Sequence, residues 1–286
     1  MSQRRPGPRR GSRRPPPPAR GFTKRPDARR GAGGEQVEGR QAVTELLAAG
    51  RRAVIDVWLA SEAEHRPGPS GPLSGKPGPV VDRITELAAS RGVPVRRVSA
   101  ARLESEARTE APQGVLAHAA ALPEVDLDAL CRAGPGPPFL LALDGVTDPQ
   151  NLGALLRTAE GAGVTGAVLP RHRAAHVTPA VTKAAAGAVE HVPIAVVGGL
   201  PAALSRARDL GLWVLGLDPG ADQSLFDLTL ADQGVVVVLG AEGRGLSRLV
   251  RDRCDLVLDI PLKGRLPSLN VAAAGALALF EISRRR

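Results

Sequence analysis

The sequence predicts an α/β protein with a mostly parallel sheet, helices on both of its faces, and a smaller α/β domain in front of it. Along most of the chain, short apolar runs alternate with segments of helical spacing, which is the pattern of βα units. A Pro- and Gly-rich stretch, RAGPGPP at 132–138, interrupts this alternation and divides the body in two. The predicted parts are a tail at 1–34, a domain at 35–122, a linker at 123–138 and a domain at 139–286.

The tail differs sharply in composition from the rest of the chain. Residues 1–34 hold eleven basic residues and one acid, with seven Pro and six Gly, whereas the remaining 252 residues carry 27 basic and 28 acidic side chains. Such a segment cannot bury enough apolar surface to offset its ordering entropy, so we predict that it is disordered. An Arg-rich disordered arm is typical of nucleic-acid contact, and a solubilising tail is the alternative.

The front domain is expected to alternate helix and strand in the order α-β-α-β-α-β. The elements assigned by spacing are helices at 37–47 and 81–89 and strands at 53–59, 93–98 and 114–119. Residues 66–79 hold nine Pro and Gly among fourteen positions, which predicts a flexible loop.

The back domain contains the predicted parallel sheet. Its apolar runs suit strands buried on both faces and lie at 139–143, 164–169, 192–197, 212–217, 234–239 and 256–260, with a long helix after Ser268. Ligands of such sheets bind outside the carboxyl ends of the strands. We therefore expect the functional residues directly after the strands.

Several classes of protein are excluded by composition. No segment approaches the roughly 18 unbroken apolar residues of a membrane span, and the charged N-terminus has no apolar core of a secretory signal. Two cysteines, Cys131 and Cys254, rule out a disulfide framework, and the five histidines show no metal-ligand spacing. We expect a cytoplasmic protein that needs no metal and does not associate with membranes. Without Tyr, and with few Phe and Trp, it lacks the aromatic face of base-stacking RNA modules.

The first loop with chemistry-bearing residues is DGVTDPQNLGALLRTAEGAG at 144–163. A strand leads into it and a helix follows, with Asn151 as a candidate N-cap and Arg157 six residues later. An Arg in mid-helix is usually solvated. Its position near a helix N-terminus, which favours anions, raises a phosphate or ribose site.

Two further loops follow later strands. In VLGAEGRG at 238–245 the glycines indicate close approach of the backbone to a ligand, with Glu242 as a polar anchor; a tight turn with a solvated Glu is the alternative. In LDIPLKGRLPSLNVAA at 258–273 a basic loop leads into a helix, with Ser268 as candidate N-cap and Asn270 in the first turn. Each loop alone is a weak signal.

Together the three loops resemble the three motifs of the SPOUT-class RNA ribose 2′-O-methyltransferases. The likeness is greatest to the branch that methylates a guanosine ribose in bacterial large-subunit (23S) ribosomal RNA, and it covers essentially all of 35–286. The front domain is similar to that branch's RNA-binding domain, which is like ribosomal protein L30e. Val37-Glu38-Gly39-Arg40 opens that domain here, and Pro112-Gln113-Gly114-Val115 lies near its end.

The resemblance implies a C-terminal trefoil knot and S-adenosylmethionine as the cofactor. The cofactor-binding positions it implies are Leu217, Gly240, Gly245, Ile260 and Leu269. Close backbone approach at glycines and burial of adenine by apolar strand ends agree with that assignment.

The implied reaction transfers the sulfonium methyl group to a ribose 2′-hydroxyl, and the implied catalytic set is Asn151, Arg157, Glu242, Ser268 and Asn270. The resemblance implies that Arg157 activates the hydroxyl. A guanidinium is effectively never deprotonated in proteins, so two roles stay open. Arg157 either grips the target phosphate and polarises the hydroxyl while water takes the proton, or acts as the base through close phosphate contact.

The resemblance also implies a homodimer in which the first motif of one subunit completes the pocket of the other. The apolar C-terminal helix fits such an interface, and core packing explains it equally well. A catalytically silent RNA-binding protein, a nucleotide-dependent oxidoreductase, and a methyltransferase acting on transfer RNA or on a ribosomal adenosine are the alternatives. The intact catalytic set disfavours the first, the absence of GxGxxG disfavours the second, and the separate front domain favours ribosomal RNA.

Overall fold

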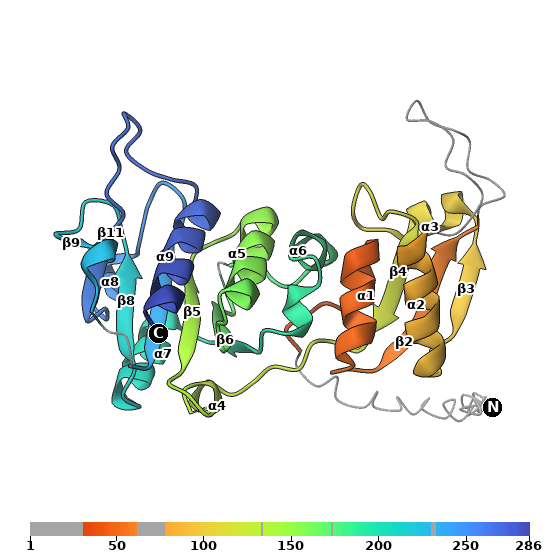
Figure 1. Ribbon diagram of the computed structural model, residues 1–286, viewed down its shortest axis with the longest axis horizontal. Helices are drawn as coiled ribbons and strands as arrows, with labels where there is room; N and C mark the ends of the chain where they lie inside the picture. The colour runs from red at the N-terminus through yellow and green to blue at the C-terminus, as the bar shows by residue number, and fades with distance from the viewer. Residues whose placement is uncertain (1–30, 62–77, 133, 173, 230–232) are drawn as a thin grey trace, which may run out of the picture.

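The computed structural model describes residues 31–61, 78–132, 134–172, 174–229 and 233–286, which form two α/β domains side by side (Figure 1). The tail predicted at 1–34 falls outside the described residues up to position 30, as does most of the loop predicted at 66–79. The predicted α/β class with a mostly parallel sheet is confirmed.

The front sheet has the strand order β1-β4-β2-β3. The pairs β1–β4 and β2–β4 are antiparallel and β2–β3 is parallel. Helices α1 and α2 share one apolar core with the sheet, and α3 contacts β2. The elements are β1 (Gln36–Glu38), α1 (Arg40–Ala49), β2 (Val54–Ala60), α2 (Pro79–Ser90), β3 (Val95–Val98), α3 (Ala100–Glu106) and β4 (Val115–Ala119).

The first element of this domain differs from the prediction. Val37 was expected to open a helix, but it is the middle residue of β1 and pairs with Ala117 of β4. Gly39, at φ 95°, then turns the chain, and α1 begins at Arg40. A strand of three residues joined directly to a helix leaves too short a pattern for its period to be recognised.

The back sheet has the order β7-β6-β5-β10-β8-β11-β9, and all of its pairs are parallel. The predicted six strands are present, together with a two-residue edge strand, β9, that the sequence did not reveal. The strands are β5 (Phe139–Asp144), β6 (Gly166–Pro170), β7 (Ile194–Val197), β8 (Trp213–Leu217), β9 (Gln223–Ser224), β10 (Val235–Gly240) and β11 (Leu256–Asp259). The helices are α4 (Leu127–Leu130), α5 (Pro149–Gly161), α6 (Pro179–Ala184), α7 (Leu200–Asp209), α8 (Arg248–Arg251) and α9 (Val271–Arg285), with 3-10 turns η2 (Ala188–Glu190) and η3 (Leu225–Asp227).

Helices cover both faces of this sheet, as predicted. In β5, Leu141 and Leu143 enter one core with α5 and α9, while Leu140 and Ala142 enter the other with α4 and α7. Successive residues of a strand point to opposite faces, so a strand covered on both sides must be apolar throughout. This is the physical reason for the unbroken apolar runs.

Two segments assigned to the tail and the linker are structured. Ala32 is buried, and its amide donates to the carbonyl of Leu122. Within the linker predicted at 123–138, Leu130 of α4 is buried against the back sheet. Both corrections have one cause: a few apolar side chains in a Gly- or Pro-rich stretch suffice to anchor it once a complementary surface lies beside it.

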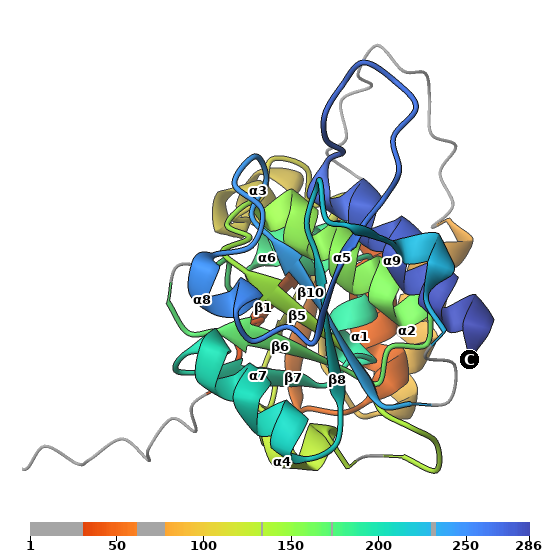
Figure 2. The same ribbon diagram turned by 90° about the vertical axis from the view of Figure 1, so that its left-hand side faces the viewer.

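The parallel strands place their carboxyl ends at one edge of the sheet. The chain between β11 and α9 extends beyond this edge as a long loop (Figure 2), in which residues 261–270 are all exposed. Within the described residues, no helix is long and apolar enough to cross a membrane.

Candidate active site

A pocket of about 370 Å³ opens at the carboxyl ends of β8, β10 and β11. Three chain segments line it: 217–219 after β8, 239–245 at the end of β10, and residues between 259 and 274 after β11. The two later motifs of the sequence therefore meet in one cavity. All five positions expected to bind the cofactor line it, namely Leu217, Gly240, Gly245, Ile260 and Leu269.

The turn after β10 explains two of the glycines. Ala241 and Gly245 exchange backbone hydrogen bonds of 3.1 and 2.9 Å. A Cβ atom on Gly240 would lie 2.1 Å from the carbonyl carbon of Gly245, and Gly245 itself has φ +63°. Gly240 is thus required by the chain's own backbone, whatever ligand the pocket holds. Both glycines still form the pocket wall.

Hydrogen bonds between three side chains, two amides and one carboxylate, connect all three motifs. The Nδ2 of Asn270 donates to Oδ1 of Asn151 at 3.0 Å, and the Nδ2 of Asn151 donates to Oε2 of Glu242 at 3.4 Å. Glu242 and Ser268 line the pocket, whereas Asn151 and Asn270 lie beside it. Four of the five predicted catalytic residues are therefore gathered at this mouth.

The two helix caps differ from the prediction. Asp148, not Asn151, caps α5, since its carboxylate accepts from the amides of Gln150 and Asn151, each at 3.2 Å. Asn270, not Ser268, caps α9, since its Oδ1 accepts from the amide of Ala272 at 2.8 Å. Asp and Asn are good caps, and Pro at the first helical position of α5 fixes where that helix starts. Asn151 and Ser268 keep their side chains free of capping.

Arg157 is the exception among the predicted catalytic residues. It is exposed on α5, two helical turns from the N-terminus, and does not line the pocket. Among the described residues it has no hydrogen bond or ion-pair partner. A single chain therefore does not bring Arg157 to the pocket.

Two acids at the pocket were missed by the sequence interpretation. Asp218 follows β8 and forms an ion pair with Arg251, and Asp259 ends β11 and accepts from the amide of Gly220 at 3.3 Å. Both line the pocket. Their position directly at a strand end was the available signal; Asp259 is the second residue of the third motif, whereas Asp218 belongs to none of the three.

The thiols are not suited to nucleophilic chemistry. Burial raises the pKa of Cys254 to about 12 and that of Cys131 to about 11, so both stay protonated near neutral pH. Within the described part of the chain, no three His, Cys, Asp or Glu side chains gather as metal ligands.

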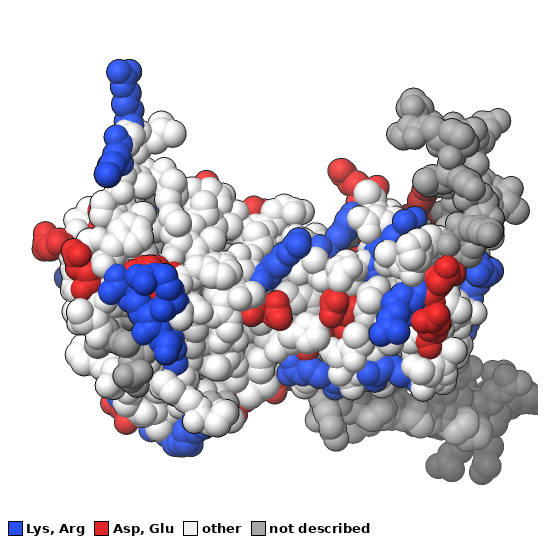
Figure 3. Space-filling model, in the orientation of Figure 1, with Lys and Arg blue, Asp and Glu red and all other residues white. Residues whose placement is uncertain are grey.

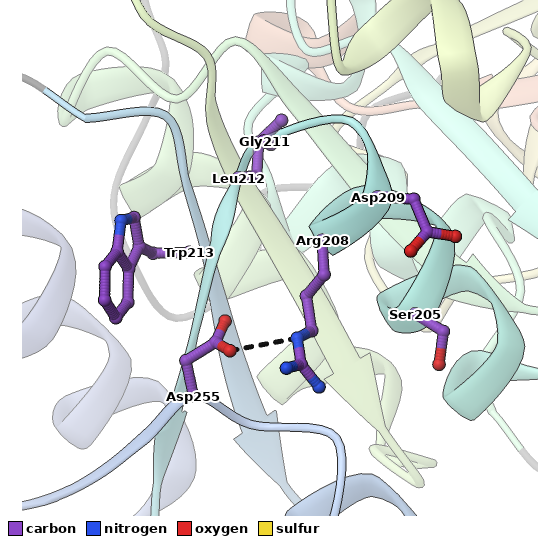
Figure 4. A pocket seen from close by; sticks show the side chains of 7 residues that line it. All are labelled: Ser205, Arg208, Asp209, Gly211, Leu212, Trp213 and Asp255. Atoms are coloured by element: carbon purple, nitrogen blue, oxygen red, sulfur yellow. Dashed lines mark ion pairs between the residues drawn. The ribbon is translucent and has the colours of Figure 1, made fainter.

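A second hollow, of about 530 Å³, lies at the opposite end of the back sheet (Figure 4). There the Nε of Arg208 pairs with Asp255 at 2.9 Å, and the other carboxylate oxygen of Asp255 accepts from the amide of Val214. Trp213 lies on the other side of Asp255 (Figure 4). None of the three motifs reaches this hollow, which leaves the pocket at the carboxyl ends as the candidate active site.

Comparison with known families agrees with this geometry. Residues 138–280 match the SpoU rRNA methylase family, and residues 36–125 match the substrate-binding domain of RNA 2′-O ribose methyltransferases. The chain belongs to the SpoU rRNA methylase family. It is accordingly a methyltransferase, and the resemblance drawn from the three motifs is confirmed.

Relatives of known name extend over nearly the whole chain. A protein of Pseudomonas aeruginosa, named 23S rRNA (guanosine-2′-O-)-methyltransferase RlmB, is 39% identical over 88% of this chain and 97% of its own. A protein of the same name from a Burkholderia species is 45% identical over 70% of this chain and 81% of its own. Among solved structures, the AdoMet-bound rRNA methyltransferase of Sinorhizobium meliloti is similar with a TM-score of 0.69 and 25% identity, over 87% of this chain and 86% of that one.

Proposed function

We propose that this protein transfers a methyl group from S-adenosylmethionine to the ribose 2′-hydroxyl of a guanosine in 23S ribosomal RNA. The observation that carries the proposal is the convergence of the second and third motifs in one pocket, with Asn151 of the first motif hydrogen-bonded at its mouth. Relatives that cover most of the chain are named for this reaction. Action on ribosomal RNA also favours the cytoplasm as its location.

The residues of the pocket fit the cofactor. Its volume of about 370 Å³ falls in the range of small-molecule sites, roughly 300–1,000 Å³. Apolar side chains of Leu217, Ile260 and Leu269 would bury the adenine, and the carboxylates of Asp218 and Asp259 would favour a cationic ligand. When bound, S-adenosylmethionine supplies an activated methyl group, so positioning of the ribose can provide much of the rate.

The ribose would approach through the mouth formed by Asn151, Glu242 and Asn270. Their amide and carboxylate groups are exposed or half-buried and can exchange their mutual hydrogen bonds for bonds to sugar hydroxyls. The loop beyond them carries Lys263 and Arg265, and basic side chains stand at its tip in Figure 3. These cations would attract the phosphates beside the target nucleotide.

We further infer that Arg157 acts on the pocket of a second subunit. It is exposed, unpaired among the described residues and remote from the pocket of its own chain. Leu277 and Phe280 of α9 are 45% and 53% exposed, which supports a partner surface on that helix. In a homodimer the guanidinium would stay charged, hold the phosphate and polarise the hydroxyl, or act as the base through that phosphate contact.

Mixing two variants that are impaired in different parts of the site tests this arrangement. If the site is shared, Arg157→Ala and Gly240→Ala proteins should regain activity when their subunits are exchanged, because one of the two sites then has an intact pocket and an intact Arg157. Mixtures that stay inactive despite exchange, or a chain that sediments as a monomer, would contradict the shared site.

Two finer features of the fold are part of the proposal. We infer that the segment after β11 forms the trefoil knot of the family, supported by its meeting with the 239–245 turn in the pocket. The front domain is inferred to be like ribosomal protein L30e, which its alternating strands and helices support. The division at 35–122 and 139–286 agrees with the two family matches.

Mapping 2′-O-methyl groups in total RNA from cells with and without the gene tests the function. One 23S guanosine should lose its methyl group when the gene is deleted. Loss from a transfer RNA or from an adenosine would change the assigned substrate. If no position changes and calorimetry detects no S-adenosylmethionine binding, the chain is a silent RNA-binding protein.

A further inference from the structure

The front and back domains meet along a seam of polar and charged residues, here called the interdomain joint. It consists of Glu45, Arg51 and Arg52 of the front domain and Lys183, Glu190 and His191 of the back domain. The helices α1 and α6 lie on its two sides (Figure 1), and α6 contacts β1. None of these residues belongs to the three catalytic motifs.

A buried ion pair forms the centre of the joint. The Nη2 of Arg52 is 2.6 Å from Oε1 of Glu190, and its Nε donates to Oε2 at 3.1 Å, so the two groups meet in a planar fork. The side chains are 2% and 1% exposed. Arg52 also donates to the carbonyls of Gly34 and Ala120, each at 2.6 Å. The guanidinium of Arg52 therefore connects Glu190 of the back domain to the segments that precede β1 and follow β4 in the front domain.

The backbone of the back domain turns sharply just before Glu190. Ala186 and Gly187 have φ values of +49° and +86°, and they turn the chain between α6 and η2, which carries Glu190. A non-Gly residue at positive φ stores strain that the surrounding structure must offset. A Cβ on Gly187 would lie 2.5 Å from that of Glu45, and one on Gly33 would lie 2.4 Å from the carbonyl oxygen of Val177. The two domains approach as closely as glycine allows.

Further polar contacts surround the ion pair. The Nε2 of His191 lies 2.9 Å from Oε2 of Glu45, and Arg51 donates to the backbone carbonyl of Glu190 at 2.9 Å. Lys183 of α6 donates to the carbonyl of Ala111 in the front domain. The contacts are spread over several elements of each domain, so the joint resists rotation as well as separation.

The joint connects directly to the helix of the first catalytic motif. Helix α6 packs on α5, and a Cβ on Gly153 of α5 would lie 2.4 Å from that of Ala184 and 2.9 Å from the carbonyl of Val181. Asn151 and Arg157 lie on α5, on either side of Gly153. The angle of the front domain is therefore fixed relative to both residues.

We propose that the Arg52–Glu190 pair positions the RNA substrate. It holds the front domain at one angle to α5, so that an RNA bound by the front domain presents its target ribose to the catalytic pocket. Arg52 and Glu190 are positioning residues in this account, since neither touches substrate or cofactor. The proposal rests on the proposed function.

The variant Glu190→Gln removes the charge and keeps the shape of the side chain. On a 23S transcript long enough to contact both protein domains, kcat/KM should fall on the order of tenfold or more, because a small misplacement of the substrate slows the reaction strongly. Most of the loss should appear as a lowered kcat, because the RNA still binds the front domain but presents its ribose at the wrong angle. On a short hairpin that contains only the target, and in S-adenosylmethionine affinity, the variant should match the wild type. The control Asp128→Asn, which breaks an ion pair with Arg206 inside the back domain, should leave both substrates unaffected.

A second pair of variants separates steric effects from strain. Gly187→Ala places a methyl group into α1, whereas Gly211→Ala, outside the three motifs, meets no atom within 4 Å at a similar φ of +90°. Only Gly187→Ala should reproduce the selective loss on the long transcript. Hydrogen exchange at 31–34 and 187–191 should rise in that variant and in Glu190→Gln.

The proposal is overturned if either variant opens the joint by hydrogen exchange yet methylates the long transcript like the wild type. It is also overturned if long and short substrates lose activity equally. A wild-type protein that methylates no ribosomal RNA would instead refute the proposed function. The exchange experiment would still report whether Glu190 holds the domains together.

Discussion

Polar side chains lie in opposite environments at the pocket and at the interdomain joint. At the pocket mouth, Asn151 and Glu242 are joined by one hydrogen bond of 3.4 Å, and residues 261–270 are exposed. At the joint, Arg52 and Glu190 are almost fully buried, and the two hydrogen bonds between them are 2.6 and 3.1 Å and join two charged groups. Exposed groups with weak partners can exchange them for a ligand, whereas buried and satisfied groups fix geometry.

Glycine has the same role in both regions. Gly240 at the pocket and Gly187 at the joint each lie where a Cβ would collide with another part of the chain. A glycine therefore indicates that another group approaches the backbone closely, but the residue type does not show which group. Only the neighbouring atoms tell that both glycines serve the protein's own packing.

The largest effect is expected from Arg157→Ala. Methyl transfer should fall by about 10²–10⁴-fold, as for loss of a group that assists proton transfer, because Arg157 would both hold the phosphate and polarise the 2′-hydroxyl. Fold and S-adenosylmethionine binding should be unchanged, since Arg157 is exposed and outside the pocket. Single-turnover transfer and calorimetry measure the two quantities.

Arg157→Lys distinguishes the possible roles of this residue. Lysine keeps the charge but loses the planar fork, so a bidentate contact predicts a large loss and a simple charge effect predicts partial activity. Arg253→Ala, at another exposed arginine of the back domain, serves as the control. Near-normal transfer by Arg157→Ala would leave Arg157 as a surface residue.

The next effect in size is expected from Gly240→Ala. The added methyl group would displace the 241–245 turn, which should lower S-adenosylmethionine affinity and reduce stability by about 1–3 kcal/mol, as for overpacking elsewhere. Gly264→Ala lies in the projecting loop with no atom within 4 Å and should bind like the wild type. Equal affinities in both variants would mean that the cofactor does not depend on this turn.

Deletion of residues 1–30 should have a smaller effect, confined to RNA. The eleven basic residues lie within this segment, and their loss should weaken RNA binding and flatten its salt dependence through reduced counterion release. The deletion ends at 30 because Gly31 and Ala32 contact the front domain. An unaltered salt slope in filter binding would show that the arm does not contact RNA.

The smallest effect concerns an ion pair on the surface of α9. Hydrogen bonds from Arg284 and Arg285 lower the pKa of Glu281 from 4.5 to about 2. Its contribution to stability is therefore present above about pH 4.5 and disappears as the pH falls through about 2. Wild type and Glu281→Gln should differ slightly in Tm at neutral pH, and the difference should vanish near pH 2. A difference that persists there would exclude this ion pair as the cause.

The sequence by itself determined the strands of the back sheet and the three motifs. Strands buried on both faces must be apolar throughout, and this requirement is local enough to be visible in runs such as 139–143. The motifs were recognisable because Asn151, Glu242 and Asn270 each lie in a characteristic run of residues that follows a strand. The carboxyl edge of a parallel sheet then gathers such residues without further information.

The tertiary structure decided which neighbours each residue meets. It placed Arg157 away from its own pocket, gave Gly240 a packing role, moved the helix caps to Asp148 and Asn270, and paired Arg52 with Glu190 across 138 positions of sequence. No periodicity reports such contacts, because a buried ion pair depends on two surfaces that meet only after both domains have folded. No local sequence pattern surrounds Arg52 or Glu190, so only their burial in the folded protein shows that they have a structural role.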